Sequence, residues 1–351
     1  MVPTSFIPFL NEVGTIEKAI QGAVYALRSN LKDKHEIIVA DNGSTDGTLE
    51  IINKIRNIRT IHVPVKGYGA ALHYGILSAK FPFVLFADAD LSYSFWEIKK
   101  FIPYLDKNID LVLGSRFKGK IDKYAMPFLH RYLGTPILTL LIRTIYGIRT
   151  TDCNSGMRMI RKSFYKELIM RNSGMEWASE LLIKSVIHRG KYAEVPISFQ
   201  KDKRKNKPHL RRWEDGWRHL KVIILFKPSI LFFSAIAMIV AGIIFIPFSL
   251  FTTIAFFLIA EFIFMSYLAV RKLEAYIDKE PNFVSKILEK IPLVLIATLV
   301  SIFGFFQLLI ISDQHLFTKY IFLSQPIMFD LFVFFIETIK TYLVNPLPEK
   351  I

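Results

Sequence analysis

Short apolar runs and helix-like repeats alternate along residues 1–160 of the chain. The runs expected to be buried strands cover residues 2–8, 36–40, 60–63, 83–87 and 109–114. The segments with apolar side chains at helical spacing cover residues 16–28, 46–55 and 68–80. Strands that alternate with helices in this way predict an α/β domain, Rossmann-like, with a mostly parallel sheet covered by helices on both faces.

The second half of the chain carries a long stretch without charge. Residues 228–260 contain no Asp, Glu, Lys or Arg, whereas a helix needs only about 20 residues to cross the hydrocarbon layer of a bilayer. The run must therefore turn back on itself, and Pro247 and Ser249 mark the turn. Asp330 and Glu337 interrupt the last apolar segment, so the pattern predicts three or four membrane helices. The predicted helices cover residues 230–248, 250–270, 292–311 and 320–339.

The basic residues of the chain gather just ahead of the first predicted span. The formal net charge is +15, and nine Lys or Arg against three Asp or Glu lie between Lys201 and Lys221. A basic stretch beside a span is attracted to anionic headgroups, so the pattern favours a lipid bilayer over nucleic acid as the partner. Trp213 and Trp217 lie four residues apart, which predicts an amphipathic helix at the membrane interface.

The sequence thus predicts three parts: an α/β domain over residues 1–200, a basic interfacial segment over 201–228 and a transmembrane domain over 229–351. No secretory leader precedes the first strand, and the loop 271–290 is rich in Lys and Arg. We therefore expect a multi-pass integral membrane protein with its α/β domain in the cytoplasm; in a prokaryote the membrane would be the plasma or inner membrane. The single cysteine, Cys153, excludes an internal disulfide and suits a reducing compartment.

Two carboxylates lie one residue apart at the end of a predicted strand. Asp88 and Asp90 follow the apolar run 83–87, and ligands of open α/β sheets bind at the carboxyl ends of the strands. Residues i and i+2 of a strand point the same way. The pair therefore predicts a site for Mg²⁺ or Mn²⁺, whose other ligands would include phosphate oxygens.

Two loops nearby have the composition of a nucleotide site. Asp41 ends the second predicted strand and precedes a turn rich in Gly, Ser and Thr, so its carboxylate can accept hydrogen bonds from a ribose or a base. The small-residue loop 66–71, which includes Gly67, leads into a helix and can bring backbone close to anionic oxygens. The spacing is not that of a Walker loop.

These motifs, taken as a set, resemble glycosyltransferase family 2, whose members have the GT-A fold. The segments FIPFLNE, VADNGSTDGT, KGYGAAL and the DAD pair are similar to its nucleotide-sugar half. Later segments resemble the polyprenyl-phosphate branch of the family, which contains the dolichyl-phosphate mannose and glucose synthases. These segments are GSRF, AMPFLHRYLG, NSGMR, GMEWASELLIK, EVPI and PHLRRWEDGWRHLK. The resemblance covers residues 2–226, with the motifs in matching order.

The resemblance implies roles for individual residues. Asp88 and Asp90 would hold the metal, and Arg116 and Arg131 would face the acceptor phosphate. The nucleotide sugar is implied to contact Pro8, Asn11, Glu12, Asp41, Gly67 and Asp88, with Lys203 and Arg204 in a loop that closes over the diphosphate. In one departure, Asn42 stands where family members commonly carry a second acid.

The reaction expected is the inverting, metal-dependent transfer of a hexose from UDP- or GDP-hexose to a polyprenyl phosphate, dolichyl or undecaprenyl. A phosphate monoester is already largely an anion at neutral pH, so it needs positioning by arginine rather than a base. An acceptor with a sugar hydroxyl would instead require a base. Glu176 and Glu180 are the candidates for that role.

Two other functions remain open at this point. A processive polysaccharide synthase of the same fold would carry Q-x-x-R-W, of which the chain has only Arg212 and Trp213. A non-enzymatic translocator of lipid-linked sugars would use intramembrane polar groups such as Glu261 and Gln307. The identity of the donor and the oligomeric state, including a homo-oligomer, are left open.

Overall fold

A computed structural model of the protein describes residues 3–31, 35–203, 212–248, 250–277 and 347. The chain divides into two compact units. The first comprises residues 1–223 together with 346–351, and the second comprises residues 224–345.

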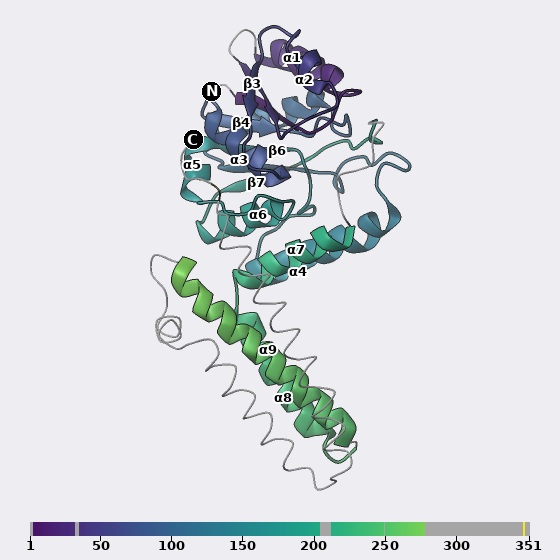
Figure 1. Ribbon diagram of the computed structural model, residues 1–351, viewed down its shortest axis with the longest axis vertical. Coiled ribbons are helices and arrows are strands. Elements are labelled where there is room, and N and C mark those ends of the chain that lie inside the picture. Colours follow the sequence, from purple (N-terminus) through teal and green to yellow (C-terminus); the bar gives the residue numbers. More distant parts are fainter. Residues whose placement is uncertain (1–2, 32–34, 204–211, 249, 278–346, 348–351) are drawn as a thin grey trace. The chain divides into compact units, whose positions relative to one another are not determined.

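The first unit is built on a seven-stranded sheet with the order β3-β2-β1-β4-β6-β5-β7 (Figure 1). Its strands are β1 (Pro3–Phe9), β2 (Glu36–Asp41), β3 (Arg59–His62), β4 (Phe83–Phe86), β5 (Leu111–Ser115), β6 (Arg158–Arg161) and β7 (Tyr192–Pro196). Only β6 runs antiparallel to its neighbours, β4 and β5, in the described sheet. The predicted α/β domain with a mostly parallel sheet is therefore confirmed, although the sequence pattern predicts neither β6 nor β7.

Helices cover both faces of this sheet, as its strand pattern requires. The longer ones are α1 (Ile16–Leu31), α3 (Tyr68–Ser78), α4 (Thr135–Tyr146), α6 (Trp177–Ile187) and α7 (Arg212–Leu225). Shorter helices and turns are α2 (Thr48–Ile52), η1 (Phe95–Lys100), η2 (Ile102–Tyr104), η3 (His130–Gly134) and α5 (Lys162–Glu167). Helix α2 is shorter than the predicted 46–55: Asp46 accepts the N–H of Thr48 in the turn that precedes it, and after Ile52 the chain continues as turns with hydrogen bonds between residues three apart.

The alternation of side chains along β1 shows how the two layers are held. Ile7 and Phe9 belong to the buried cluster that includes Ile16 and Ile20 of α1. Phe6 points to the opposite face and meets α3, where its ring lies against the backbone of Gly75. Successive residues of a strand face opposite sides of the sheet, so β1 is buried on both of its faces. Packing from the helices on both faces therefore fixes the position of its carboxyl end.

The second unit contains a hairpin of two apolar helices, α8 (Ser229–Phe245) and α9 (Leu250–Ile277). The two helices run antiparallel, since Phe232 contacts Tyr267 at 5.3 Å and Phe245 contacts Phe256 at 5.4 Å between ring centroids. They lie on either side of the predicted turn at Pro247. The predicted segments 292–311 and 320–339 lie outside the described residues.

Within the part of the chain that the structure describes, no single helix is both long and apolar enough to cross a membrane. One bent pair of helices, Glu214–Leu225 with Ser229–Phe245, passes this test when the two are taken together, by length and composition only.

The close contact between α3 and β1 predicts opposite effects for two Gly→Ala substitutions in helices. A Cβ on Gly75 would lie 2.0 Å from the Phe6 ring, whereas a Cβ on Gly22 of α1 would meet nothing within 4 Å. We expect Gly75→Ala to destabilise the protein by about 1–3 kcal/mol through overpacking. Gly22→Ala should stabilise it by about 0.5–1 kcal/mol, because alanine favours the helix.

The midpoint of urea unfolding of the full chain, followed by circular dichroism, measures both changes. Equal shifts for the two variants would contradict the packing described for α3 and β1.

Candidate active site

The acidic residues singled out in the sequence meet at one edge of the sheet. Strands β2, β1 and β4 are parallel neighbours, and Phe9 of β1 is paired in register with Asp41 of β2. Their carboxyl ends therefore lie side by side, which brings Glu12, Asp41 and Asp88 to the same edge. This is the edge at which open α/β sheets bind their ligands.

The loops after β1 and β2 are joined by a network of hydrogen bonds. Asn11 donates its N–H to the Ser44 hydroxyl at 3.0 Å and accepts the N–H of Thr45 at 2.8 Å. Asp41, only 2% exposed, accepts the N–H of Ser44 at 2.9 Å. The hydroxyl of Thr15 donates to the buried Glu12 carboxylate at 2.7 Å. Asn11, Glu12 and Asp41 thus fix the loops.

Asn42 joins this network to the glycine loop before α3. Its side-chain N–H donates to the carbonyl of Val65 at 2.8 Å, and its Oδ1 accepts the N–H of Gly67 at 2.7 Å. An ionised carboxylate only accepts hydrogen bonds, so an acid could not make both contacts. The amide here is explained by its role as donor and acceptor at once.

Gly67 has a backbone conformation that suits glycine alone. Its φ is +132°, and a Cβ would lie 2.2 Å from the carbonyl oxygen of Ser173. The loop therefore packs directly on the segment that precedes α6. This close approach sets the start of α3 and with it the position of Tyr68.

The acidic tip of β4 is held by hydroxyl donors. Asp88 Oδ1 accepts the hydroxyl of Tyr68 at 2.8 Å, and burial, followed by the Asp88 charge, raises the pKa of Tyr68 well above its usual value. Asp90 Oδ1 accepts the N–H and the hydroxyl of Ser92, at 2.9 and 2.6 Å. Its backbone carbonyl accepts the N–H of Lys203 at 3.1 Å, so the segment after β7 lies against the tip.

The donor set at this tip fits a hard divalent cation. Mg²⁺ is commonly held by one or two carboxylates and completed by water and substrate phosphates, and Asp88 and Asp90 supply two carboxylates. The described residues contain no group of three or more His, Cys, Asp or Glu able to hold a metal by themselves. A cation here would accordingly depend on the diphosphate for further ligands.

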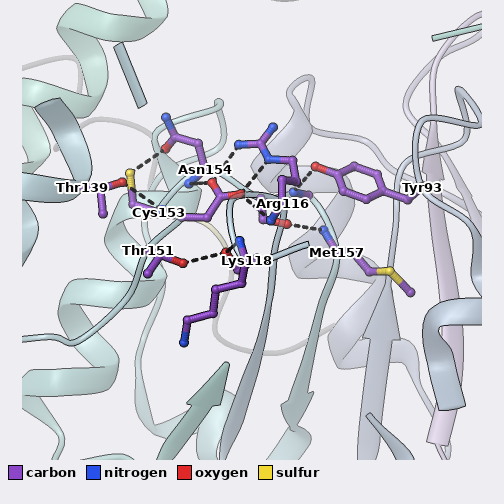
Figure 2. A network of polar contacts seen from close by, with 12 residues as sticks. Tyr93, Arg116, Lys118, Thr139, Thr151, Cys153, Asn154 and Met157 are labelled. Carbon is purple, nitrogen blue, oxygen red and sulfur yellow. Dashed lines mark hydrogen bonds and ion pairs between the residues drawn. The ribbon is translucent and has the colours of Figure 1, made fainter. Parts of the chain in front are cut away.

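A second network joins the loop after β5 to the loop between α4 and β6 and surrounds Arg116 (Figure 2). Its Nε and Nη2 donate to the two oxygens of Asp152 at 2.7 and 2.8 Å, and its backbone N–H donates to the same carboxylate at 3.0 Å. Asp152 is fully buried and Arg116 is 8% exposed. Burial disfavours the charged guanidinium, yet Asp152 outweighs it and holds the pKa of Arg116 above its ordinary value. A role for Arg116 toward an acceptor phosphate stays a prediction.

The other predicted residues lie on separate elements. Arg131 is in the short π-helix η3 ahead of α4; it is partly exposed, and its guanidinium lies 5.6 Å from the Tyr132 ring centroid. Pro8 is buried within β1. Lys203 is exposed, and Arg204 lies outside the described residues.

The structure corrects one of the two candidate bases. Glu180 is fully buried, and its oxygens accept the N–H groups of Arg171 and Asn172 at 2.9 and 2.8 Å and pair with Lys184 at 2.7 Å. It therefore supports the loop ahead of α6 and cannot reach a substrate hydroxyl. For Glu176, at the start of α6, burial raises the pKa of the carboxyl, and its role as a base stays a prediction.

Three residues of the site were missed by sequence reasoning: Tyr68, Asp152 and Gly156. Tyr68 stands between two glycines in the loop 66–71. A large aromatic residue between two glycines is a signal that its side chain occupies a defined position. Asp152 and Gly156 flank the segment CNS, whose turn-forming residues follow no predicted strand. Their partners are distant in sequence, so spacing alone could not reveal them.

The Arg116–Asp152 pair predicts a large loss of stability when the carboxylate is removed. In Asp152→Asn, the buried guanidinium would lose its counter-charge, which costs about 3–5 kcal/mol when a buried pair is broken. Asp122→Asn is the matched control, because Asp122 is 44% exposed and forms only a long ion pair, 3.7 Å between its Oδ1 and the Nζ of Lys120. The free energy of unfolding measures both, and equal stability of the two variants would contradict the pairing as the main support of these loops.

Comparisons with known proteins agree with this geometry. Residues 4–169 match the family model of glycosyl transferase family 2. The low-salt glycan biosynthesis hexosyltransferase Agl6 of Haloferax volcanii is 33% identical over 227 residues, which cover 64% of this chain but only 54% of that protein. The uncharacterized protein MJ1222 of Methanocaldococcus jannaschii is 31% identical over 199 residues, covering 54% of this chain and 78% of its own length.

Among solved structures, a mycobacterial protein covers 64% of this chain and 74% of its own, with a TM-score of 0.50 and 19% identity. Glucosyl-3-phosphoglycerate synthase from Mycobacterium tuberculosis, crystallised with Mn²⁺, UDP and glucosyl-3-phosphoglycerate, covers 65% of this chain and 79% of its own, with a TM-score of 0.49 and 23% identity. The sequence matches lead to one conclusion: through its N-terminal domain, the chain belongs to glycosyltransferase family 2.

Proposed function

We propose that this protein is a membrane-associated glycosyltransferase that moves a hexose from UDP- or GDP-hexose to a polyprenyl phosphate, with inversion at the sugar carbon. The proposal includes a multi-pass C-terminal domain, an interfacial α7 and a catalytic domain on the cytoplasmic side. The observation that carries it is an arginine set in an exposed apolar surface close to the start of α4.

This surface, the α4 face, consists of large apolar side chains that are each between 48% and 70% exposed. Its residues are Phe128, Leu129, Tyr132, Leu133, Ile137 and Leu140. Exposed apolar patches of this kind mark protein or membrane contacts. Because Arg131 stands between Leu129 and Tyr132 in this segment, a lipid that enters along the α4 face would present its phosphate to a cation.

Helix α7 also supports the proposal that this side of the domain lies on a membrane. It lies along α4 (Figure 1), where the hydroxyl of Tyr146 donates to the carbonyl of Ile223. Trp217 on α7 is 45% exposed, and indole rings favour the headgroup level of a bilayer. The basic composition of residues 201–221 adds attraction to anionic lipids.

An anionic acceptor also suits the chemistry of the described side chains. A phosphate monoester can attack without a protein base, and Glu180, one of the two candidate bases for a hydroxyl acceptor, is fully buried and accepts the N–H of Asn172. Arginine binds phosphate through paired hydrogen bonds. Arg131 would therefore position the acceptor, and Lys203 beside the acidic tip would lie near the donor diphosphate.

At the donor end, Asp88 and Asp90 would hold Mg²⁺ or Mn²⁺ together with the diphosphate. The chemistry that such a cation supplies when bound is neutralisation of the charge that develops on the departing nucleoside diphosphate. The hexose class rests on the name of the similar Haloferax volcanii hexosyltransferase, and the lipid acceptor on the resemblance to the polyprenyl-phosphate branch.

A direct assay tests the function. The purified full chain, labelled UDP- and GDP-sugars and a polyprenyl phosphate in detergent should yield an extractable, acid-labile glycolipid that EDTA abolishes. A water-soluble polymer as the only product would favour a polysaccharide synthase. No product from any donor, with transport of lipid-linked sugar across vesicles, would favour a translocator.

Asp90→Asn should lower transfer at least about 100-fold, because losing an anionic ligand weakens the metal–diphosphate interaction on which the leaving group depends. Asp106→Asn, an exposed substitution outside the site, is the control and should retain full activity. Rates measured across a Mn²⁺ titration separate weakened metal binding from misfolding, because added Mn²⁺ can restore part of the activity only in the first case. Full activity of Asp90→Asn would remove the metal assignment.

Arg131→Ala should raise the KM for the lipid phosphate about 10- to 100-fold, since hydrogen bonds to a charged group contribute roughly 1.5–3 kcal/mol. The KM for the nucleotide sugar should stay the same. Arg143→Ala, an exposed arginine in the last turn of α4, is the matched control. A selective loss of donor affinity in Arg131→Ala would move this arginine to the donor side of the site.

A further inference from the structure

The Asp88 carboxylate is held from two sides by residues that the family resemblance does not assign. On one side, the Tyr68 hydroxyl donates to Oδ1 at 2.8 Å. On the other, the bare backbone of Gly156 approaches so closely that a Cβ there would lie 2.3 Å from Oδ2. The carboxylate thus sits between a hydrogen-bond donor and a wall.

The wall is a consequence of sheet register. Strand β6 runs antiparallel to β4, with Arg158 opposite Phe86. Asp88 lies two residues after the end of β4, and Gly156 lies two residues before the start of β6. Continued beyond the strand ends, the same register places Gly156 opposite Asp88. The Gly156 N–H donates to the Tyr93 hydroxyl at 2.8 Å, and the Tyr93 ring packs on Phe199 at 5.1 Å between centroids. Gly156 is therefore fixed in its place.

The donor is fixed equally well. Tyr68 is the first residue of α3, between Gly67 and Gly69. A Cβ on Gly69 would lie 2.5 Å from Cβ of Trp177, and the N–H of Ala70 donates to the carbonyl of Ser173 at 3.0 Å. The start of α3 is thus pressed onto the segment before α6. The backbone that carries Tyr68 is therefore fixed relative to α6, and its hydroxyl is held at the β4 tip by the hydrogen bond to Asp88.

Together these contacts restrict the rotation of the carboxylate. Turning the carboxylate about its last side-chain bond would break the hydrogen bond from Tyr68, and the close approach of Gly156 leaves little space on the Oδ2 side. Outer contacts that orient metal-binding carboxylates typically change metal affinity by 10- to 100-fold when removed. We propose that Tyr68 and Gly156 are positioning residues that set the orientation of the Asp88 carboxylate toward the donor diphosphate and its cation.

This inference rests on the proposed function, because it assumes that Asp88 acts at a metal–nucleotide site. Tyr68→Phe removes one oxygen atom and keeps the ring, so it tests the hydrogen bond alone. Tyr74→Phe, on the same helix but away from the acidic tip, is the matched control. Gly156→Ala tests the wall by adding a single methyl group.

The measurement is the affinity of the full chain for Mn²⁺ in the presence of UDP and, separately, of GDP, read from the electron paramagnetic resonance of free Mn²⁺. We expect Tyr68→Phe to weaken Mn²⁺ binding about 10-fold or more and Tyr74→Phe to leave it unchanged. Gly156→Ala should weaken it at least as much. Melting temperatures of the variants separate a local effect from a loss of fold, and if Gly156→Ala does not fold, Tyr68→Phe decides alone.

A double substitution makes the test specific to Asp88. In an Asp88→Asn background, the further change Tyr68→Phe should have little additional effect on Mn²⁺ affinity, because the oriented carboxylate is already gone. Equal Mn²⁺ affinity of the wild type and Tyr68→Phe, or fully additive effects in the double variant, would overturn the positioning role and leave the proposed function intact. A wild-type chain that binds no Mn²⁺ with either nucleotide would overturn both.

Discussion

Parallel pairing of β2, β1 and β4 places three acidic loops side by side, and the proposed chemistry depends on this arrangement. Each strand ends at the same edge, so Asp41, Glu12 and Asp88 approach one another although they are far apart in the sequence. The strands are held there by side chains buried on both faces of the sheet, such as Ile7 toward α1 and Phe6 toward α3. Core packing thus sets the geometry of the polar edge, and a shift of one strand would displace a carboxylate.

Buried charge organises the other half of the domain. Arg116 is neutralised by Asp152, whereas Arg158 sends its hydrogen bonds to the main-chain carbonyls of Cys153, Ser155 and Ala178, at 2.7–3.0 Å. Burial lowers the pKa of Arg158. Both arginines tie the loop between α4 and β6 to the sheet. Because Gly156 belongs to this loop, the same charges hold the wall behind Asp88.

Much of this could be predicted from the sequence, for physical reasons. Strands buried on both faces are apolar throughout, which is why β1, β2 and β4 were predicted, and an acidic pair directly after such a strand points to a ligand site. Strand β6 could not be found this way, because its sequence RMIR is short and half of it is basic. Tyr68, Asp152 and Gly156 were missed for another reason: their hydrogen-bond partners lie on other elements, between 20 and 63 residues away in the sequence. Glu180 was expected to be accessible, but the loop at Arg171 and Asn172 folds back over it and donates two N–H groups to its carboxylate. The spacing of residues in the sequence does not reveal such a contact.

The central claim is that the acidic tip of β4 holds a cation together with the donor diphosphate. Crystals of the protein grown with Mn²⁺ and UDP or GDP, measured at the manganese absorption edge, test it most directly. The account predicts an anomalous-difference peak beside the carboxylates of Asp88 and Asp90 and the bound diphosphate. A diphosphate bound with no manganese peak beside Asp88 and Asp90 would contradict it.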